Sequence, residues 1–117
     1  MLDVLGVYWV DFGNNRAGEF SGNHYGLVLS VPSMKDRTLL VAPITSKKPK
    51  TRYRGGIFID CHKYQKNPTK DKAFIKVRKI REVHISRIKG DKVYDLDEGD
   101  KIRLIASIKD TITFLKE

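Results

Sequence analysis

His24 is the residue of this chain whose side chain is best suited to proton transfer. It stands between a polar, glycine-containing segment and an apolar run, within EFSGNHYGLVLS (residues 19–30). Histidine exchanges a proton near neutral pH because its ordinary pKa is about 6.5. Gly22 and Asn23 allow a sharp turn just before it, and a strand from Gly26 would anchor it on a rigid element. This setting suits a general acid or base, although a lone histidine is more often a solvated residue at the mouth of a strand.

Hydroxyl groups follow a second apolar run. The segment VAPITS (residues 41–46) is typical of a strand that ends in Thr45 and Ser46. A rigid strand end at the mouth of a barrel can present a hydroxyl to a substrate, although both residue types are common at ordinary strand ends. From the residues alone, the ordinary strand end is the simpler interpretation.

Cations are concentrated in two stretches. The first, SKKPKTRYRGG (residues 46–56), holds five basic residues within eight positions, with Tyr53 among them. Cations neutralise phosphates and an aromatic ring stacks on an unpaired base, so this loop suits single-stranded nucleic acid; the alternative is a solvated loop. Its basic residues are Lys47, Lys48, Lys50, Arg52 and Arg54.

The second basic stretch is KVRKIR (residues 76–81). Lys76 and Arg78 are two residues apart, so they share a face if the segment is a strand. Two cations on one strand face need either an anion nearby or exposure to water. We expect the pair to bind phosphate, and Arg81 to be a further cation or a purely structural one.

The sequence contains no recognised metal motif. His62 and His84 lack a companion at metal-ligand spacing, and we expect both at the surface or in an interface. The acidic run DLDEGD (residues 95–100) is typical of a turn followed by the first turn of a helix, where the helix dipole favours negative charge. The single cysteine, Cys61, excludes an intrachain disulfide and a zinc site built on cysteine pairs. We therefore expect no metal and no cofactor.

Length and charge narrow the class of protein. The 117 residues fit one domain over 1–117, and 23 Lys plus Arg against 14 Asp plus Glu give a net charge of +9. This excess suits nucleic acid, an acidic protein or an anionic membrane surface, although solubility alone would also account for it. No apolar stretch approaches the ~20 residues that span a bilayer. With one cysteine and no basic N-terminal region, the chain is expected in the cytoplasm.

The elements that must position these residues are mostly strands. Short runs rich in β-branched and aromatic residues predict strands over 5–12, 26–31, 39–44, 56–60, 73–80 and 92–96. A spacing of three and four predicts an amphipathic helix from about Glu98 to Lys116. The expected fold is mainly β (α+β): a small, barrel-like antiparallel sheet with a C-terminal helix packed against it. The apolar face of that helix would consist of Ile102, Ile105, Ile108, Ile112 and Leu115.

Five segments in order resemble the MazF/PemK toxin family over about residues 6 to 115. The resemblance implies an SH3-like barrel, a homodimer and metal-independent, sequence-selective cleavage of single-stranded RNA, which would inhibit translation and growth. It also implies an antitoxin partner whose acidic, flexible tail covers the RNA groove, and it gives no reason to expect a membrane partner. The segments are GVYWVDF, GEFSGNHYGLVLS, LLVAPITS, IFIDCHKY and KIREVHISRI.

Individual residues carry the resemblance further. Thr45 matches the threonine at the family's strand end, Arg81 matches the arginine of its I-R-T segment, and Glu19 matches the glutamate of its S-E-Q loop. The family's catalytic loop arginine falls on His24, and the proline after it becomes Tyr25. We expect Glu19, Ser46, Arg81 and the basic loop with Tyr53 to bind RNA.

The resulting hypothesis assigns a role to each catalytic candidate. His24 accepts the 2′-hydroxyl proton, Thr45 donates a hydrogen bond, and Lys76 with Arg78 holds the phosphate. Attack by the 2′-oxygen then gives a 2′,3′-cyclic phosphate and a 5′-hydroxyl. Two alternatives remain open: a non-catalytic toxin on the same barrel that acts by protein contact, like the gyrase-poisoning toxins, and a general nucleic-acid-binding module.

Overall fold

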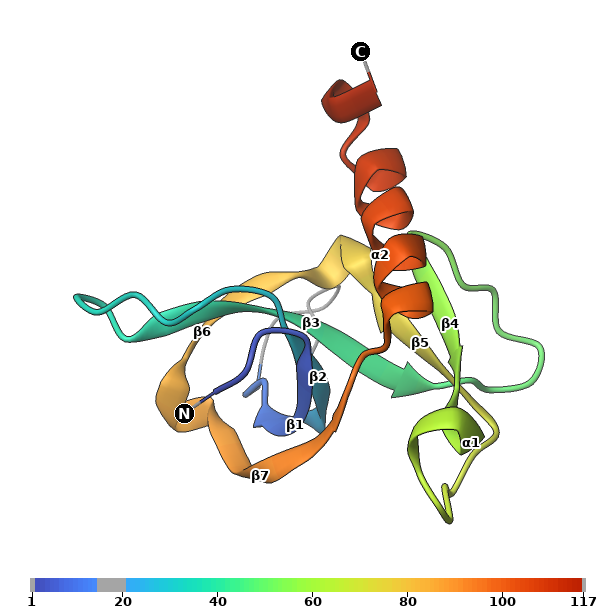
Figure 1. Ribbon diagram of the computed structural model, residues 1–117, viewed down its shortest axis with the longest axis horizontal. Coiled ribbons are helices and arrows are strands. Elements are labelled where there is room, and N and C mark those ends of the chain that lie inside the picture. The colour runs from blue at the N-terminus through green and yellow to red at the C-terminus, as the bar shows by residue number, and fades with distance from the viewer. Residues whose placement is uncertain (1, 15–20, 117) are drawn as a thin grey trace.

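Seven strands and a C-terminal helix form most of the chain in a computed structural model, which describes residues 2–14 and 21–116 (Figure 1). The strands are β1 (Gly6–Asp11), β2 (Asn23–Val28), β3 (Thr38–Ser46), β4 (Gly56–Asp60), β5 (Lys72–Lys76), β6 (Arg81–His84) and β7 (Ile88–Asp95). The α-helices are α1 (Cys61–Tyr64) and α2 (Glu98–Thr111), and three 3₁₀-helices are η1 (Val77–Lys79), η2 (Ile85–Arg87) and η3 (Thr113–Lys116).

The long strand β3 joins two parts of one antiparallel sheet. The order is β4-β5-β3-β2-β1-β7, and β6 also pairs with β3. The first part of β3, Thr38–Val41, pairs with β6, whereas Ile44–Ser46 pairs with β5. The predicted mainly β fold with a C-terminal helix is confirmed. The barrel is open, because no ladder pairs β6 with β7 in the described residues.

Alternation along the strands places a core on each side of this curled sheet. Gly26 allows the sheet to curl, since a Cβ there would lie 2.6 Å from Val41 Cγ1 and 2.9 Å from Val10 Cγ2. Val10 and Val41 of one core therefore pack directly against the backbone of Gly26 on β2, where a side chain would not fit. The first core includes Val7, Leu27, Ile44, Ile75 and Leu104, and the second includes Tyr8, Val10, Phe12, Val28 and Val41.

The predicted strand over 73–80 is wrong beyond Lys76. There β5 ends, and η1 turns the chain before β6 begins at Arg81. The backbone N–H of Arg78 donates to the carbonyl of Gly55 at 3.1 Å, and that of Ile80 donates to Val77 at 3.3 Å, so the ladder does not continue. Lys76 and Arg78 therefore do not share a strand face.

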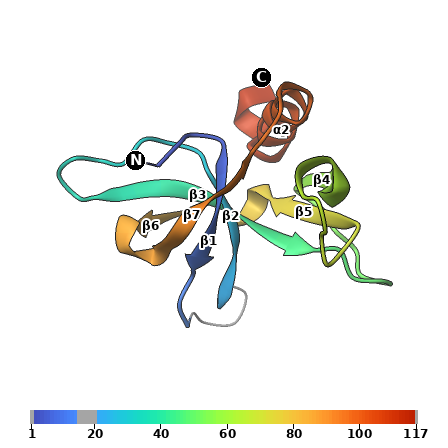
Figure 2. The ribbon, with the colours of Figure 1, turned by 60° about the horizontal axis from the view of Figure 1, so that its bottom comes forward.

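The predicted apolar face of the C-terminal helix is correct only at Ile108, and the α-helix ends at Thr111 rather than near Lys116. Leu104 is only 2% exposed and Ile108 packs on the first core, but Ile102 is 61% exposed and Ile105 is 44% exposed. Ile112 and Leu115, at the far end of that face, are 40% and 45% exposed. Figure 1 shows the C-terminal end of α2 projecting beyond the sheet, and Figure 2 shows α2 on the side of β4 and β5.

A polar network fixes the rotation of α2. Asp97 caps the helix by accepting from the backbone N–H of Asp100 at 2.8 Å. The Asp100 carboxylate is buried and accepts from the Tyr64 hydroxyl at 2.6 Å and from Lys63 at 3.1 Å. Arg103 bridges Asp100 at 2.6 Å and the Phe58 carbonyl at 2.8 Å. These contacts turn Asp100, Leu104 and Ile108 toward the sheet and leave the other isoleucines of the predicted face exposed. The acidic helix start predicted for residues 95–100 is confirmed.

No helix in the described part of the chain combines the length and apolar character needed to cross a bilayer.

Candidate active site

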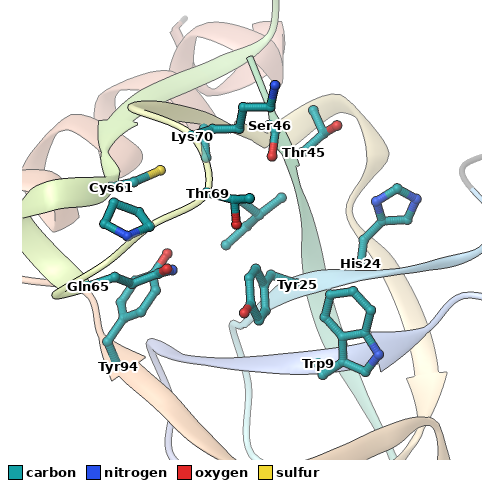
Figure 3. A pocket seen from close by; sticks show the side chains of 13 residues that line it. Trp9, His24, Tyr25, Thr45, Ser46, Cys61, Gln65, Thr69, Lys70 and Tyr94 are labelled. Carbon is teal, nitrogen blue, oxygen red and sulfur yellow. The ribbon is translucent and has the colours of Figure 1, made fainter. Parts of the chain in front are cut away.

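A cavity of about 420 Å³ opens where the ends of β1, β2 and β3 face the segment between α1 and β5. Its floor is apolar and its rim carries hydroxyl, amide, imidazole and ammonium groups (Figure 3). Predicted site residues also line two smaller cavities, of about 250 Å³ and 350 Å³, and Lys47 and Lys48 line the one of about 350 Å³. We call the cavity of about 420 Å³ the first cavity. It is lined by Trp9, His24, Tyr25, Ile44, Thr45, Ser46, Cys61, Gln65, Pro68, Thr69, Lys70, Ala73 and Tyr94.

His24 and Thr45 lie at the same end of the first cavity. The ladder between β2 and β3 ends with Tyr25 opposite Ile44, so His24 and Thr45 follow at the same level on adjacent strands. Figure 3 shows both side chains at one end of the cavity, beyond Tyr25. The sequence hypothesis needs the imidazole and the hydroxyl in one place, and the fold brings them together.

The hydrogen bond of His24 identifies its basic nitrogen. Nε2 lies 3.1 Å from the carbonyl oxygen of Ser21, and a carbonyl oxygen can only accept, so Nε2 carries the proton in this bond. In the neutral ring the proton-accepting lone pair is then on Nδ1. Burial lowers the pKa of His24 below its ordinary 6.5, and the charges of Lys76 and Lys48 lower it further, against the opposing bond to Ser21. His24 is thus mainly a neutral imidazole at pH 7.

A second cavity, of about 250 Å³, is strongly basic. Its aromatic floor is formed by Phe74 and Tyr53, and Lys76 lies two residues beyond Phe74 on the same face of β5. Because Lys76 also lowers the pKa of His24, its charge acts on both cavities. The remaining lining residues of the second cavity are Arg52, Arg54, Arg78 and Lys79.

Arg78 belongs to the second cavity rather than beside His24. Its side chain lies over Gly55, where an added Cβ would overlap the Arg78 stem, and Gly55 has a φ of +69° that favours glycine. The charges that lower the pKa of His24 are those of Lys76 and Lys48. Arg78 is therefore not beside the imidazole, whereas the charge of Lys48 acts on His24 from a neighbouring cavity that Lys48 and Lys47 line.

The basic loop is held by Tyr53. The Tyr53 hydroxyl accepts from the backbone N–H of Lys48 at 2.8 Å and donates to the carbonyl of Ser46 at 3.4 Å. Its ring packs on Phe58 and Phe74, with centroids 5.4 Å and 5.0 Å away. Lys47 lies over the Phe58 ring at 5.9 Å. Within the described residues, none of the loop cations pairs with a carboxylate: Lys47, Lys48, Lys50, Arg52 and Arg54.

Comparison with known proteins identifies the family. The family described as PemK-like, MazF-like toxin of type II toxin–antitoxin system matches residues 4–111. The chain belongs to this family. Among solved structures it is similar to the Mycobacterium tuberculosis toxin MazF-mt6, with a TM-score of 0.63 and 12% identity, over 91% of this chain and 94% of that one. At this identity the likeness shows the fold. No curated protein matches the chain.

The other residues predicted from the MazF/PemK resemblance are placed as follows. Ser46 lines the first cavity beside Thr45. Arg81 is half-buried and donates to the Phe12 carbonyl at 3.3 Å, which favours the structural role over contact with RNA. Glu19 lies outside the described residues.

The two remaining histidines lie at the surface, as predicted. The ring of His62 pairs with Asp71 at 2.8 Å, and that of His84 contacts the Ser86 hydroxyl at 2.9 Å. In the described residues, no group of three or more His, Cys, Asp and Glu side chains is placed to hold a metal ion.

Sequence reasoning missed one side of the first cavity. Trp9 and Tyr25 form a T-shaped pair at its mouth, with centroids 5.1 Å apart and an interplanar angle of 80°. Gln65 and Thr69 reach the cavity from the segment after α1. The single tryptophan in an apolar strand could have indicated this side of the cavity. The alternation of residues along the strand, however, does not show whether the sheet face that carries Trp9 is buried or exposed.

Proposed function

We propose that this chain acts as one MazF-type toxin domain that cleaves single-stranded RNA in the cytoplasm without a metal ion. The observation that carries the proposal is the position of His24. Its imidazole lies with Thr45 at one end of a cavity, and two lysines are close enough to lower its pKa. A neutral base beside fixed cations is what attack by a 2′-hydroxyl requires.

The geometry supports a definite sequence of proton and bond changes. Nδ1 of His24 takes the proton of the 2′-hydroxyl while the 2′-oxygen attacks phosphorus. Thr45 donates a hydrogen bond to a phosphoryl oxygen, and Lys76 and Lys48 stabilise the negative charge that develops. The bond from phosphorus to the 5′-oxygen then breaks, and that oxygen takes a proton from water or from an ammonium group. The products are a 2′,3′-cyclic phosphate and a 5′-hydroxyl.

The second cavity and the basic loop would guide the strand to this site. Arginines and lysines surround an aromatic floor, which suits phosphates and unpaired bases. Lys76 borders the second cavity and acts on His24, so an RNA strand crossing it would pass from one cavity to the other. This arrangement favours RNA over the alternative of a toxin that acts only by protein contact.

The test is incubation of purified protein with a long single-stranded RNA in EDTA. Discrete fragments with 2′,3′-cyclic phosphate ends are expected, and the same sequence in a duplex should be cut weakly or not at all. RNA that stays intact in EDTA but is cut once magnesium is added would show that the mechanism is wrong. Charge reversal at Lys48, Arg52 and Arg54 should weaken RNA binding for every sequence alike, because phosphate contacts carry no base information.

We also propose a homodimer and an acidic antitoxin partner. The exposed isoleucines and Phe114, which is 70% exposed, leave apolar surface on α2 and η3, and closed two-fold pairs are the common way to cover such surface. Light scattering at micromolar concentration should give twice the chain mass; a monomer would contradict this. An acidic, disordered antitoxin segment should compete with RNA for the basic cavities and reduce cleavage.

A further inference from the structure

We propose that the first cavity holds one unpaired nucleobase of the RNA, next to the cleaved phosphate. The base would stack on Trp9 at the mouth, and its edge would be read by Gln65 and Thr69. The inference rests on the proposed function and deepens it, because it names the groups that select the sequence.

The cavity has the size and composition of a site for a small planar group. Its volume of about 420 Å³ falls in the range of small-molecule sites, roughly 300–1,000 Å³. Ile44, Ala73 and Tyr25 give it an apolar floor, and polar groups stand at the rim. A nucleobase has the same division: apolar faces and a polar edge.

The tryptophan at the mouth can act as a stacking platform. Trp9 is 42% exposed although it lies on a strand whose neighbouring residues are buried. Its T-shaped contact with Tyr25 occupies at most one face of one ring, so the pair is held in place while an aromatic face stays open. Such platforms bind unpaired bases regardless of their identity.

The segment opposite supplies groups that can distinguish bases. Within the described residues, neither the Gln65 amide nor the Thr69 hydroxyl makes a hydrogen bond, and both can donate and accept. The segment is held at both ends, because the backbone N–H of Gln65 donates to Cys61 at 2.9 Å and that of Cys61 donates to Asp71 at 2.8 Å. Figure 3 shows Gln65 and Thr69 facing Tyr25 across the cavity.

The position of the pocket relates the base to the bond that is cut. His24 and Thr45 line the same cavity as Gln65 and Thr69. When a base occupies the cavity, the phosphate of that nucleotide or of the adjacent one would therefore lie beside His24. Lys70, also on the rim, can pair with a phosphate of that nucleotide. Base selection and proton transfer would thus be joined through one nucleotide.

Trp9 is the only tryptophan of the chain, so its fluorescence reports on this cavity alone. We would titrate the protein with four 2′-deoxy pentanucleotides, one for each base, which lack the nucleophile and stay intact. Quenching of the emission should saturate and should differ between bases. With labelled pentanucleotides and anisotropy as the readout, Trp9→Ala should weaken binding by about 5- to 150-fold, the loss expected for one stacked base.

Three variants separate base reading from general affinity. Gln65→Ala and Thr69→Ala should reduce the preference for the best base over the worst by about 5-fold or more. Gln65→Glu, which replaces a donor by an acceptor, should change which base is preferred. Arg54→Ala, in the second cavity, is the matched control: it should weaken all four probes alike and leave the preference unchanged.

The outcomes also separate this proposal from the ribonuclease activity. Binding without quenching, or a preference that survives both Gln65 variants and Thr69→Ala, would overturn the base site, as would quenching by an acidic peptide but by no oligonucleotide. Cleavage of long RNA in EDTA by the same preparation tests the nuclease independently. Base-dependent quenching without cleavage would remove the nuclease and keep the base site.

Discussion

Replacing His24 should separate catalysis from RNA binding. His24→Ala removes the proton acceptor and should lower the cleavage rate by about 10²–10⁴-fold, the usual size of a general acid–base contribution. Because burial and two lysines lower the pKa of His24, the ring is mainly neutral at pH 7 and adds little charge to the phosphate contacts. The affinity for a 2′-deoxy oligonucleotide should therefore change little in His24→Ala.

His24→Arg should move rate and affinity in opposite directions. Arginine stays protonated, so it adds a charge beside Lys76 and Lys48 but cannot accept the 2′-hydroxyl proton. One added phosphate contact should make the slope of log affinity against log salt more negative by about 0.7 for a single strand, while the rate falls as in His24→Ala. Single-turnover cleavage in EDTA measures the rate, and a salt series with a 2′-deoxy oligonucleotide measures the slope. If His24→Arg kept most of the activity, the imidazole would be a charge donor and not the base; full activity in His24→Ala would make it a polar group at the mouth of a strand.

Three further predictions follow from the charges and the packing. Lys76→Gln should raise the pKa of His24 and move the acidic limb of the pH–rate profile to higher pH, whereas Arg52→Gln in the second cavity should leave that limb in place. Leu104→Ala should lower the free energy of unfolding by about 2–5 kcal/mol and Ile102→Ala by less than about 0.5 kcal/mol, as measured by urea titration; similar losses would contradict the observed rotation of α2. Burial disfavours ionisation of Asp100, but hydrogen bonds from Tyr64, Lys63 and Arg103 outweigh it and hold the carboxyl pKa below its ordinary value, so their stabilisation is present above about pH 4 and is lost as the pH falls through the lowered pKa. Tyr64→Phe should therefore cost about 1–3 kcal/mol at pH 7 and less at pH 3, and an equal cost at both would refute this assignment.

Local patterns located most strands but not all of their bounds. The strand predicted over 26–31 is β2 (Asn23–Val28), the one predicted over 92–96 is the end of β7 (Ile88–Asp95), and β6 (Arg81–His84) was not predicted. The prediction of β4 has the observed bounds, Gly56–Asp60, and that of β1 differs by one residue at each end. Both are short β-branched runs between glycines or polar residues, which is the strongest local signal for a strand. The position of His24 and Thr45 at one site depended on the family resemblance, since neither residue's own spacing places it beside the other.

The errors have long-range causes. Apolar and polar residues alternate over 73–80 as they would in one strand. The backbone N–H of Arg78 instead donates to the carbonyl of Gly55, and β5 ends at Lys76. In α2 the isoleucine row has helical spacing, yet the buried face is set by Asp100, because Tyr64, Lys63 and Arg103 can satisfy its charge only if it faces the sheet. Hydrophobic periodicity uses only the positions of apolar residues, so it cannot predict that a carboxylate is buried because three side chains donate hydrogen bonds to it.

The exchange of arginine for histidine at position 24 is chemically coherent in this particular setting. An arginine at this place would supply positive charge to the phosphate, and a neutral histidine does not. In the proposed mechanism Lys76 and Lys48 supply that charge. Burial, together with the same two charges, lowers the pKa of the imidazole and favours the neutral form that can accept a proton. Loss of either lysine should therefore have two effects on cleavage, of which only one depends on pH. Phosphate binding weakens at every pH, whereas the raised pKa of His24 reduces the rate only at acidic pH, where the ring becomes protonated. If Lys76→Gln lowered the cleavage rate by the same factor at every pH, the lysine would bind phosphate and would have no influence on the pKa of His24.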